Sequence, residues 1–317
     1  MAAGHDEGDL NVLFAPPPVL ATTVFARLPD ALRRQGRDSE WHRGQPGQLP
    51  EHSLLEGPAF DRDGTLWCVD IPYGRIFRVS VDGTFSLAAE YDGEPNGLAI
   101  HRDGRIFIAD YANGIMVMDP STAAVSPFVT RVRLERLKAV NDLVFARNGD
   151  LYFTDQGLTG LHDPTGRVFR VRASGHVDLL LDNVPSPNGI ALDPDETTLY
   201  VAVTRANAVW RVPLMRDGGV AKVGNFIQLS GGGGPDGLVV DRDGNLLVAH
   251  IGLGCVWQFS PRGEPLARIQ SCTGWHTTNA AFGGVDASTL FITESETGTI
   301  LQTRMPVPGL PLFSHAT

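Results

Sequence analysis

Six oxygen-bearing side chains recur along this chain at nearly even intervals, and their types are those that bind hard divalent cations. Successive members are 40, 45, 47, 48 and 43 residues apart. In chain order they are Glu56, Asn96, Asn141, Asn188, Asp236 and Asn279. Calcium is bound in proteins by carboxylate and amide oxygens of this kind. We call these six positions the ring residues, and ask which fold could bring them together.

Each ring residue opens a copy of one sequence unit. The unit continues with a short apolar run, a polar turn and a second apolar run, as in residues 56–70 (EGPAFDRDGTLWCVD) and 96–110 (NGLAIHRDGRIFIAD). A third strand is expected at stretches such as residues 74–79, and a fourth at stretches such as residues 85–90. Four strands in a repeat of about 40 to 50 residues are typical of a propeller, whereas a helical solenoid would show a period of about 3.6. The sequence therefore predicts an all-β fold, a six-bladed β-propeller with four-stranded antiparallel blades.

The last unit has no fourth strand, which would leave an exposed sheet edge. Residues 22–27 (TTVFAR) are the candidate for this position, so we expect an N-terminal strand to close the ring. Residues 30–53 would then form a connecting loop. The expected organisation is an N-terminal arm over residues 1–20, a single propeller over residues 21–310 and a C-terminal tail over residues 311–317.

Composition excludes several classes of partner. The net charge of −10 argues against nucleic acid and anionic membranes, since both need clustered Lys and Arg. The three cysteines form no C-x-x-C pair, which argues against a disulfide framework and a zinc finger, and we expect them to be buried. Residues 1–10 lack the features of a signal peptide, and no apolar run is long enough to span a membrane. We expect a soluble, cytoplasmic protein, and the sequence makes no prediction of its oligomeric state.

In a propeller the first strand of each blade lines the central channel, so the ring residues are expected to meet at one mouth of it. A single Asn or Asp before Gly is commonly a turn residue, and turns explain why Asn recurs. Turns give no reason for two blades to carry acids, which repel each other unless a cation lies between them. We therefore predict one divalent metal bound by Glu56, Asn141, Asn188 and Asp236. Calcium is the first choice, with zinc, magnesium, manganese and iron(II) as alternatives.

Several short motifs resemble, blade by blade and in the same order, those of the regucalcin/gluconolactonase family. They are Glu56-Gly57-Pro58, Asn141-Asp142, Pro187-Asn188-Gly189, Pro235-Asp236-Gly237 and Ala281-Phe282-Gly283-Gly284. Members of that family are six-bladed propellers with a metal at the channel mouth. They hydrolyse lactones of sugar acids or related rings, and some relatives cleave phosphorus–fluorine bonds. The resemblance implies a lactonase in which Glu56, Asn188 and Asp236 bind the metal and Asn141 is either a ligand or a substrate contact.

One position departs from the family pattern. The sugar-lactone branch has an Arg two residues before the position of Asn141, and here that residue is Ala139. This difference favours a less polar ring over a highly hydroxylated sugar lactone.

The implied reaction is attack of water on a lactone carbonyl that is polarised by the metal. Asp236 is the predicted catalytic residue, because it can be both a metal ligand and a general base, and Glu56 would mainly balance charge. For Asn96 and Asn279 a turn role and a role at the channel mouth are equal alternatives. The predicted substrate contacts are Asn96, Tyr111, Asn141, His276 and Asn279.

Two other functions are compatible with the same sequence. A hydrolase of organophosphate-type electrophiles could use the same metal and carboxylates. A propeller can also act only as a binding scaffold, since a fold does not determine function. A scaffold, however, has no need of the acids Glu56 and Asp236.

Overall fold

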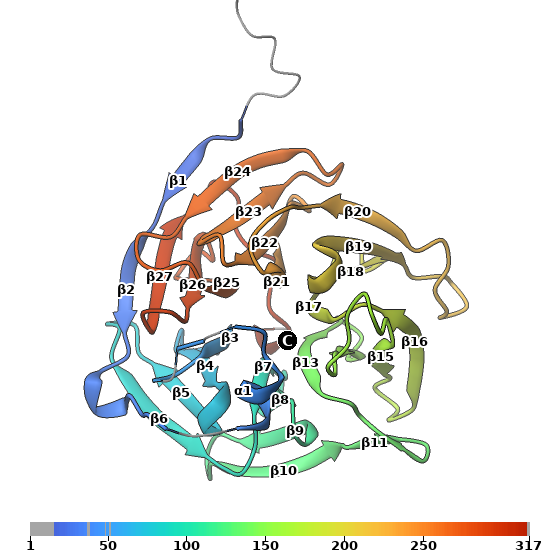
Figure 1. Cartoon of the computed structure of the whole chain (residues 1–317), viewed down its shortest axis with the longest axis horizontal. Helices are drawn as coiled ribbons and strands as arrows, with labels where there is room; N and C mark the ends of the chain where they lie inside the picture. The colour runs from blue at the N-terminus through green and yellow to red at the C-terminus, as the bar shows by residue number, and fades with distance from the viewer. Residues whose placement is uncertain (1–15, 37–38, 48, 51, 316–317) are drawn as a thin grey trace, which may run out of the picture.

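Six antiparallel sheets surround a central channel in the computed structural model (Figure 1). The structure describes residues 16–36, 39–47, 49–50 and 52–315. The innermost strands of neighbouring blades contact one another in chain order, and the sixth contacts the first. The predicted six-bladed β-propeller with four-stranded antiparallel blades is therefore confirmed.

Each blade has its first strand at the channel, and the later strands follow outward in chain order. The first blade is β3 (Leu55–Phe60), β4 (Leu66–Asp70), β5 (Arg75–Val79) and β6 (Phe85–Glu90). The second is β7 (Pro95–Ile100), β8 (Ile106–Asp110), β9 (Gly114–Asp119) and β10 (Ala124–Val129). The third is β13 (Val140–Phe145), β14 (Leu151–Asp155), β15 (Gly166–Val171) and β16 (Val177–Val184). The fourth is β17 (Pro187–Leu192), β18 (Thr198–Val203), β19 (Ala208–Pro213) and β20 (Gly224–Gln228). The fifth is β21 (Gly234–Val240), β22 (Leu246–Ile251), β23 (Cys255–Phe259) and β24 (Pro265–Gln270), and the sixth has β25 (Thr277–Gly283), β26 (Thr289–Glu294) and β27 (Thr299–Arg304).

The N-terminal segment closes the ring, as predicted. Strand β2 (Thr23–Arg27) pairs antiparallel with β27 and supplies the fourth strand of the last blade. Phe25 packs edge-on against Phe291, with ring centroids 4.9 Å apart. The preceding strand β1 (Val19–Ala21) adds to the neighbouring blade, parallel to β24, which the sequence did not predict. The segment thus joins the fifth and sixth blades.

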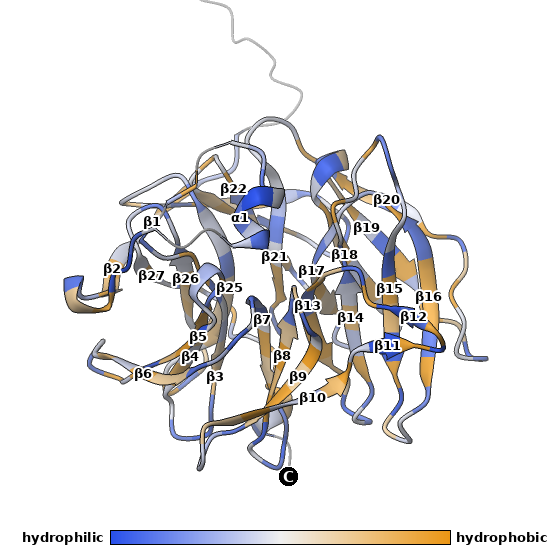
Figure 2. Cartoon of the chain, turned by 60° about the horizontal axis from the view of Figure 1, so that its bottom comes forward, coloured by the Kyte–Doolittle hydropathy of each residue, from blue (hydrophilic) through white to orange (hydrophobic). Residues whose placement is uncertain are grey.

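Short helices lie in the segment that was predicted to be a connecting loop. Residues 30–53 contain the 3-10 helix η1 (Asp30–Leu32) and the α-helix α1 (Glu40–Gly44). The Ser39 side chain caps α1 by accepting a hydrogen bond from the His42 backbone N–H. The segment connects β2 to β3, as predicted, but the sequence did not predict its short helices. Figure 2 shows α1 above one end of the inner strands β7, β13, β17 and β21.

The remaining elements are small. A two-stranded hairpin, β11 (Arg131–Val132) with β12 (Glu135–Arg136), precedes the third blade. Three further 3-10 helices are η2 (Ile71–Tyr73), η3 (Thr204–Ala206) and η4 (Phe313–His315). Within the described ranges no helix has the length and apolar character needed to cross a membrane.

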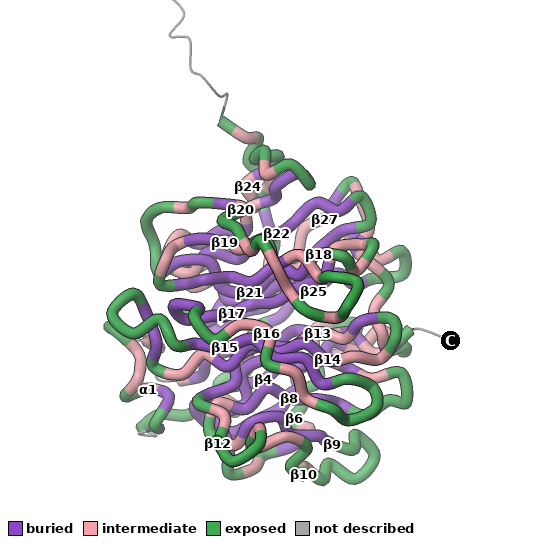
Figure 3. The backbone as a smooth tube through the Cα atoms, turned by 90° about the vertical axis from the view of Figure 1, so that its right-hand side faces the viewer, coloured by how far each residue is buried: buried purple, intermediate pink, exposed green. Residues whose placement is uncertain are grey.

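The hydrophobic core consists of layers between neighbouring blades. Leu55, Phe60 and Phe77 of the first blade, for example, pack with Ala281 and Phe291 of the sixth. Figure 3 shows this pattern as buried strands inside and exposed loops outside. Each blade therefore depends on both neighbours to exclude water from its apolar faces.

The cysteine prediction needs one correction. Cys68 and Cys255 are buried, as expected, but Cys272 is exposed, because it lies in the loop after β24 and not in a strand.

Buried carboxylates at the ends of second strands hold the loops that lead into the inner strands. Asp70, at the end of β4, accepts a hydrogen bond of 2.7 Å from the Leu54 backbone N–H and pairs with the buried guanidinium of Arg75 at 2.5 Å. Asp155, at the end of β14, accepts from the backbone N–H groups of Lys138 and Ala139. These contacts determine where the chain enters the first and third inner strands.

Replacing Asp70 by Ala should lower the free energy of unfolding by about 3–5 kcal/mol, because Arg75 would remain buried without its counter-ion. Glu90→Ala is the matched control. It removes an exposed ion pair with Arg34 and should cost about 1 kcal/mol or less. Urea denaturation measures both values, and equal losses would contradict a structural role for the buried pair.

Candidate active site at the channel mouth

A β-bulge interrupts each inner strand where the ring residues lie. The register between first and second strands shifts between Glu56 and Ala59 in the first blade and between Val140 and Leu143 in the third. The other four blades have equivalent shifts. A bulge bends a strand locally and redirects its side chains. The same device therefore recurs at all six ring positions.

The residue after a ring position packs against the next blade. A Cβ atom added to Gly189 would lie 2.3 Å from the backbone oxygen of Asp236. One added to Gly237 would lie 2.1 Å from the side chain of Asn279. The Asn-Gly and Asp-Gly pairs of the sequence thus reflect close packing around the channel, and they do not mark hairpin turns.

Threonine hydroxyls join neighbouring blades behind the ring residues. Thr154 Oγ1 of the third blade donates to the backbone oxygen of Asn188 at 2.7 Å. Thr278 Oγ1 of the sixth blade donates to the backbone oxygen of Leu55, directly before Glu56, at 2.9 Å. These buried bonds restrict the sliding of one inner strand against the next.

Most of the ring residues line one cavity of about 250 Å³, which we call the channel-mouth cavity. Its ring residues are Glu56, Asn96, Asn141, Asn188 and Asp236, and all five are buried. His276, a predicted substrate contact, also lines it, and its Nδ1 atom is buried without a hydrogen-bond partner among the described residues. The structure thus brings together the four predicted metal ligands and two more predicted site residues.

Asn279 lies behind this cavity and supports one of its walls. Its amide nitrogen donates to Glu56 Oε2 at 2.9 Å, and its amide oxygen accepts from the Ala280 backbone N–H at 2.8 Å. With both ends of the amide engaged, Asn279 orients Glu56.

The side chain of Asn141, in contrast, faces the channel-mouth cavity. Its amide nitrogen donates to Gln156 Oε1, which leaves the Asn141 oxygen available to a ligand.

Tyr111 borders an adjoining cavity of about 580 Å³, which we call the outer cavity. The two cavities share Gln45, Pro46, Gln156 and Arg205 as lining residues. Burial and the nearby Glu94 raise the pKa of Tyr111 to about 12, so its hydroxyl is protonated at neutral pH.

Three carboxyl groups of the inner strands, Glu56, Asp142 and Asp236, are buried and have raised pKa values. Burial raises the pKa of Asp142 to about 7. Burial also raises the pKa of Asp236 to about 7, opposed by a hydrogen bond from Asn188 and assisted by the charge of Asp142. For Glu56, burial and then the charges of Asp236 and Asp142 raise the pKa well above its ordinary value. A cation between Glu56 and Asp236, which both line the channel-mouth cavity, would offset the repulsion between their charges.

The donor set fits a hard cation. Within the described part of the chain, no three side chains of the types His, Cys, Asp and Glu are grouped so as to hold a metal ion. A cation here would therefore need the oxygens of Asn141 and Asn188 beside the carboxylates of Glu56 and Asp236. A mixture of carboxylate and amide oxygens is the ligand type that calcium prefers.

The sequence model of a known family matches most of the chain. The family is described as the SMP-30/Gluconolactonase/LRE-like region, and the match covers residues 54–296. The chain belongs to this family.

Named relatives and solved structures agree with that membership. A gluconolactonase of Zymomonas mobilis subsp. mobilis is 33% identical over 272 residues, 76% of this chain and 76% of that protein. Lactonase drp35 of Staphylococcus haemolyticus is 33% identical over 228 residues, 68% of this chain and 69% of that protein. A regucalcin of Agrobacterium tumefaciens, titled a calcium-binding protein, has a TM-score of 0.75 at 27% identity, covering 94% of this chain and 99% of that one. A gluconolactonase of Xanthomonas campestris has a TM-score of 0.70 at 27% identity, with 81% and 86% covered. The resemblance seen in the motifs is thus confirmed.

Some lining residues of this family member were not predicted from its sequence. Trp41, Gln45, Pro46 and Leu49 come from the segment around α1 and form part of the wall of the channel-mouth cavity. They have no counterpart in the repeat, so periodicity could not reveal them. Asp142 was visible as part of a motif, but its burial beside the other acids depends on the packing of the third blade against the fourth.

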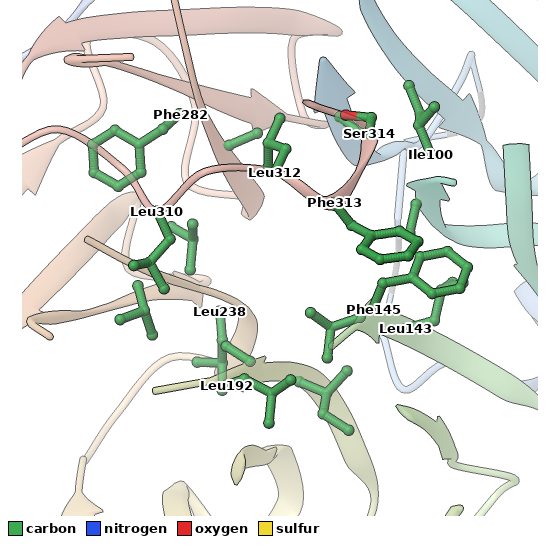
Figure 4. A pocket seen from close by; sticks show the side chains of 18 of the residues that line it. Ile100, Leu143, Phe145, Leu192, Leu238, Phe282, Leu310, Leu312, Phe313 and Ser314 are labelled. Atoms are coloured by element: carbon green, nitrogen blue, oxygen red, sulfur yellow. The ribbon is translucent and has the colours of Figure 1, made fainter. Parts of the chain in front are cut away.

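The opposite half of the channel holds an apolar cavity of about 370 Å³ (Figure 4). Leu310, Leu312 and Phe313 of the C-terminal segment extend across it, and Phe313 stacks on Phe145 with centroids 4.8 Å apart. This cavity is larger than the channel-mouth cavity, but its walls are mainly hydrocarbon. The groups suited to hydrolysis therefore lie at the other end.

Replacing Gly189 by Ala should disturb the site, because the new Cβ would lie 2.3 Å from the Asp236 backbone oxygen. We expect the unfolding free energy to fall by about 2 kcal/mol or more, as for other overpacked sites. Gly224→Ala is the control, because no atom lies within 4 Å of its added Cβ. Denaturation of both variants measures the difference, and a Gly189→Ala variant as stable as the control would refute the close packing of these blades.

Proposed function

We propose that this protein is a divalent-cation-dependent lactonase that opens a small cyclic ester with water. The observation that carries the proposal is the meeting of buried Glu56 and Asp236 with the amides of Asn141 and Asn188 in one cavity. The names of the 33% identical relatives, lactonase and gluconolactonase, support the same substrate class.

Glu56, Asn188 and Asp236 would hold the cation, and Asn141 would be a further ligand or a substrate contact. Calcium is our first choice, because all donors are hard oxygens and a structural neighbour is titled calcium-binding. When bound, the cation polarises the lactone carbonyl and offsets the negative charge that develops on its oxygen.

Asp236 is proposed as the general base. Its carboxylate accepts a proton from water as the water oxygen attacks the carbonyl carbon. The protonated Asp236 then returns this proton to the ring oxygen, which leaves as an alcohol when its bond to the carbonyl carbon breaks. The new carboxylic acid loses its own proton to solvent. Glu56, oriented by Asn279, contributes fixed negative charge beside the cation.

The walls of the channel-mouth cavity favour a substrate ring of low polarity. Trp41, Leu54 and Ile71 pack together beside Glu56, and Ile251 lines another part of the cavity. These side chains exclude water from part of the cavity, and Ala139 stands where the sugar-lactone branch has an Arg. We therefore propose a ring with fewer hydroxyl groups than a sugar lactone.

Asp236→Asn should lower kcat on a lactone substrate by about 10²- to 10⁴-fold, since loss of a general base has this effect. Asp243→Asn is the matched control, an exposed acid of the same blade in the turn after β21, and should keep normal activity. The assay is acid release from a panel of lactones, with metal content measured in parallel. Normal turnover by Asp236→Asn would remove this residue from the mechanism, and a preference for phosphofluoridates over lactones would replace the proposed substrate class.

The stability of chelator-treated protein should fall as pH rises from about 4 to about 7. In the native state the pKa values of Asp142 and Asp236 are raised to about 7. Between about pH 4 and pH 7 the native state therefore binds protons that the unfolded chain has already released. Raising the pH in this range removes those protons and lowers the free energy of unfolding. Above pH 7 the full penalty is present, and added calcium should raise the melting temperature by about 5 °C or more. At pH 5 protons compete for the same oxygens, so the gain should be smaller. Melting curves at pH 5 and pH 8 with and without calcium measure this, and a calcium effect that is absent or equal at both values would count against the site.

A further inference from the structure

Arg205 lies at the boundary of the two cavities, where its charge lowers the pKa of Asp236. Its guanidinium makes no hydrogen bond or ion pair with any residue that the structure describes, and its side chain is exposed. It borders both the channel-mouth cavity and the outer cavity. An arginine that faces two connected cavities in this way can form paired hydrogen bonds with an incoming oxyanion.

The backbone that carries Arg205 is held in place on both sides. Arg205 lies in η3, and the preceding Thr204 donates its backbone N–H to Ser186 O and its hydroxyl to Pro235 O at 2.8 Å. Pro235 directly precedes Asp236. The position of Arg205 is therefore linked to that of the proposed general base.

The outer cavity is suited to an anion with an apolar linker. Among the described residues that line it there is no Asp or Glu, and Arg205 is its only Arg or Lys. Leu158 and Leu161 add exposed hydrocarbon, with 66% and 69% of their surfaces accessible. Because the whole chain carries a net charge of −10, a negatively charged ligand needs a local cation to bind here.

Gln156 separates the two cavities and is itself fixed. Its amide nitrogen donates to Ser186 Oγ at 2.9 Å, and its amide oxygen accepts from Asn141. A molecule that reaches from the ring residues to Arg205 must pass this side chain. Gln156 therefore lies between the ring residues of the channel-mouth cavity and the outer cavity that Arg205 borders.

We propose that the outer cavity is a substrate subsite in which Arg205 binds a carboxylate or phosphate group attached to the lactone by a short apolar linker. This inference rests on the proposed lactonase function and specifies its substrate class. Arg205 is a substrate-binding residue in this scheme and takes no part in proton transfer.

The test uses the full chain with calcium and two series of γ-lactones that share one ring. One series carries a carboxylate that is separated from the ring by zero to three carbons, and the other carries the corresponding primary amide. A third set of substrates carries a phosphate ester in place of the carboxylate. We expect wild-type kcat/KM to be about tenfold higher for at least one anionic member than for its amide. Arg205→Gln should reduce that ratio to about one, mainly by raising KM for the anion relative to the amide. Arg205→Lys should keep part of the preference, and Arg216→Gln, an exposed Arg of the same blade outside both cavities, should behave as wild type.

Equal rates for anionic and neutral partners, or a preference that survives in Arg205→Gln, would overturn the subsite. Turnover of the amide series tests the lactonase function separately. If neither series is hydrolysed, the lactonase function has failed, and the subsite is tested separately by binding. Calorimetry then compares a tetrahydrofuran carboxylate with its amide, two ligands that lack the scissile ester. Tighter binding of the carboxylate that is lost in Arg205→Gln would then support the subsite alone, and equal affinity or no binding of the carboxylate would refute it.

Discussion

The structure depends on one unfavourable feature, the burial of three interacting carboxyl groups on the inner strands around the channel. Glu56, Asp142 and Asp236 are each removed from water, and their charges act on one another. Without a cation, each resists ionisation at neutral pH, which lowers the stability of the native state. The same repulsion creates a strong attraction for a divalent cation. A protein that retains such a group of acids accepts a loss of stability at the position where we propose that it binds a cation.

The architecture keeps these acids together through contacts that repeat from blade to blade. A bulge at each ring position redirects the side chain, and a glycine such as Gly189 lets the next inner strand approach closely. Hydroxyls such as that of Thr154 then bond the inner strands across the blade boundary. Each contact is weak alone, but a closed ring has no free edge along which a blade could slip. The rigidity of the site is therefore a property of the whole ring.

The two ends of the channel have been given different surroundings by segments outside the repeat. The residues around α1 contribute Trp41 to the cavity that Glu56 and Asp236 line, so these two acids are partly enclosed. The C-terminal segment contributes Leu312 and Phe313 to the apolar end. A symmetric propeller would have two similar mouths. Here the segment around α1 provides apolar walls beside Glu56 and Asp236. The outer cavity, which Arg205 borders, adjoins this same mouth of the channel.

Sequence alone determined the number of blades, their strands, the closing strand and the ring residues that meet at the channel mouth. These follow from hydrophobic alternation, turn residues and a fixed repeat, all of which are local or periodic properties of the chain. Only the tertiary structure decided that Asn279 supports Glu56, that Asp142 is buried beside the other acids, and that Trp41 and Arg205 border the site. Those relations join residues far apart in sequence with no regular spacing. They arise from the packing of one blade against the next and of the α1 segment over the channel, which no local pattern encodes.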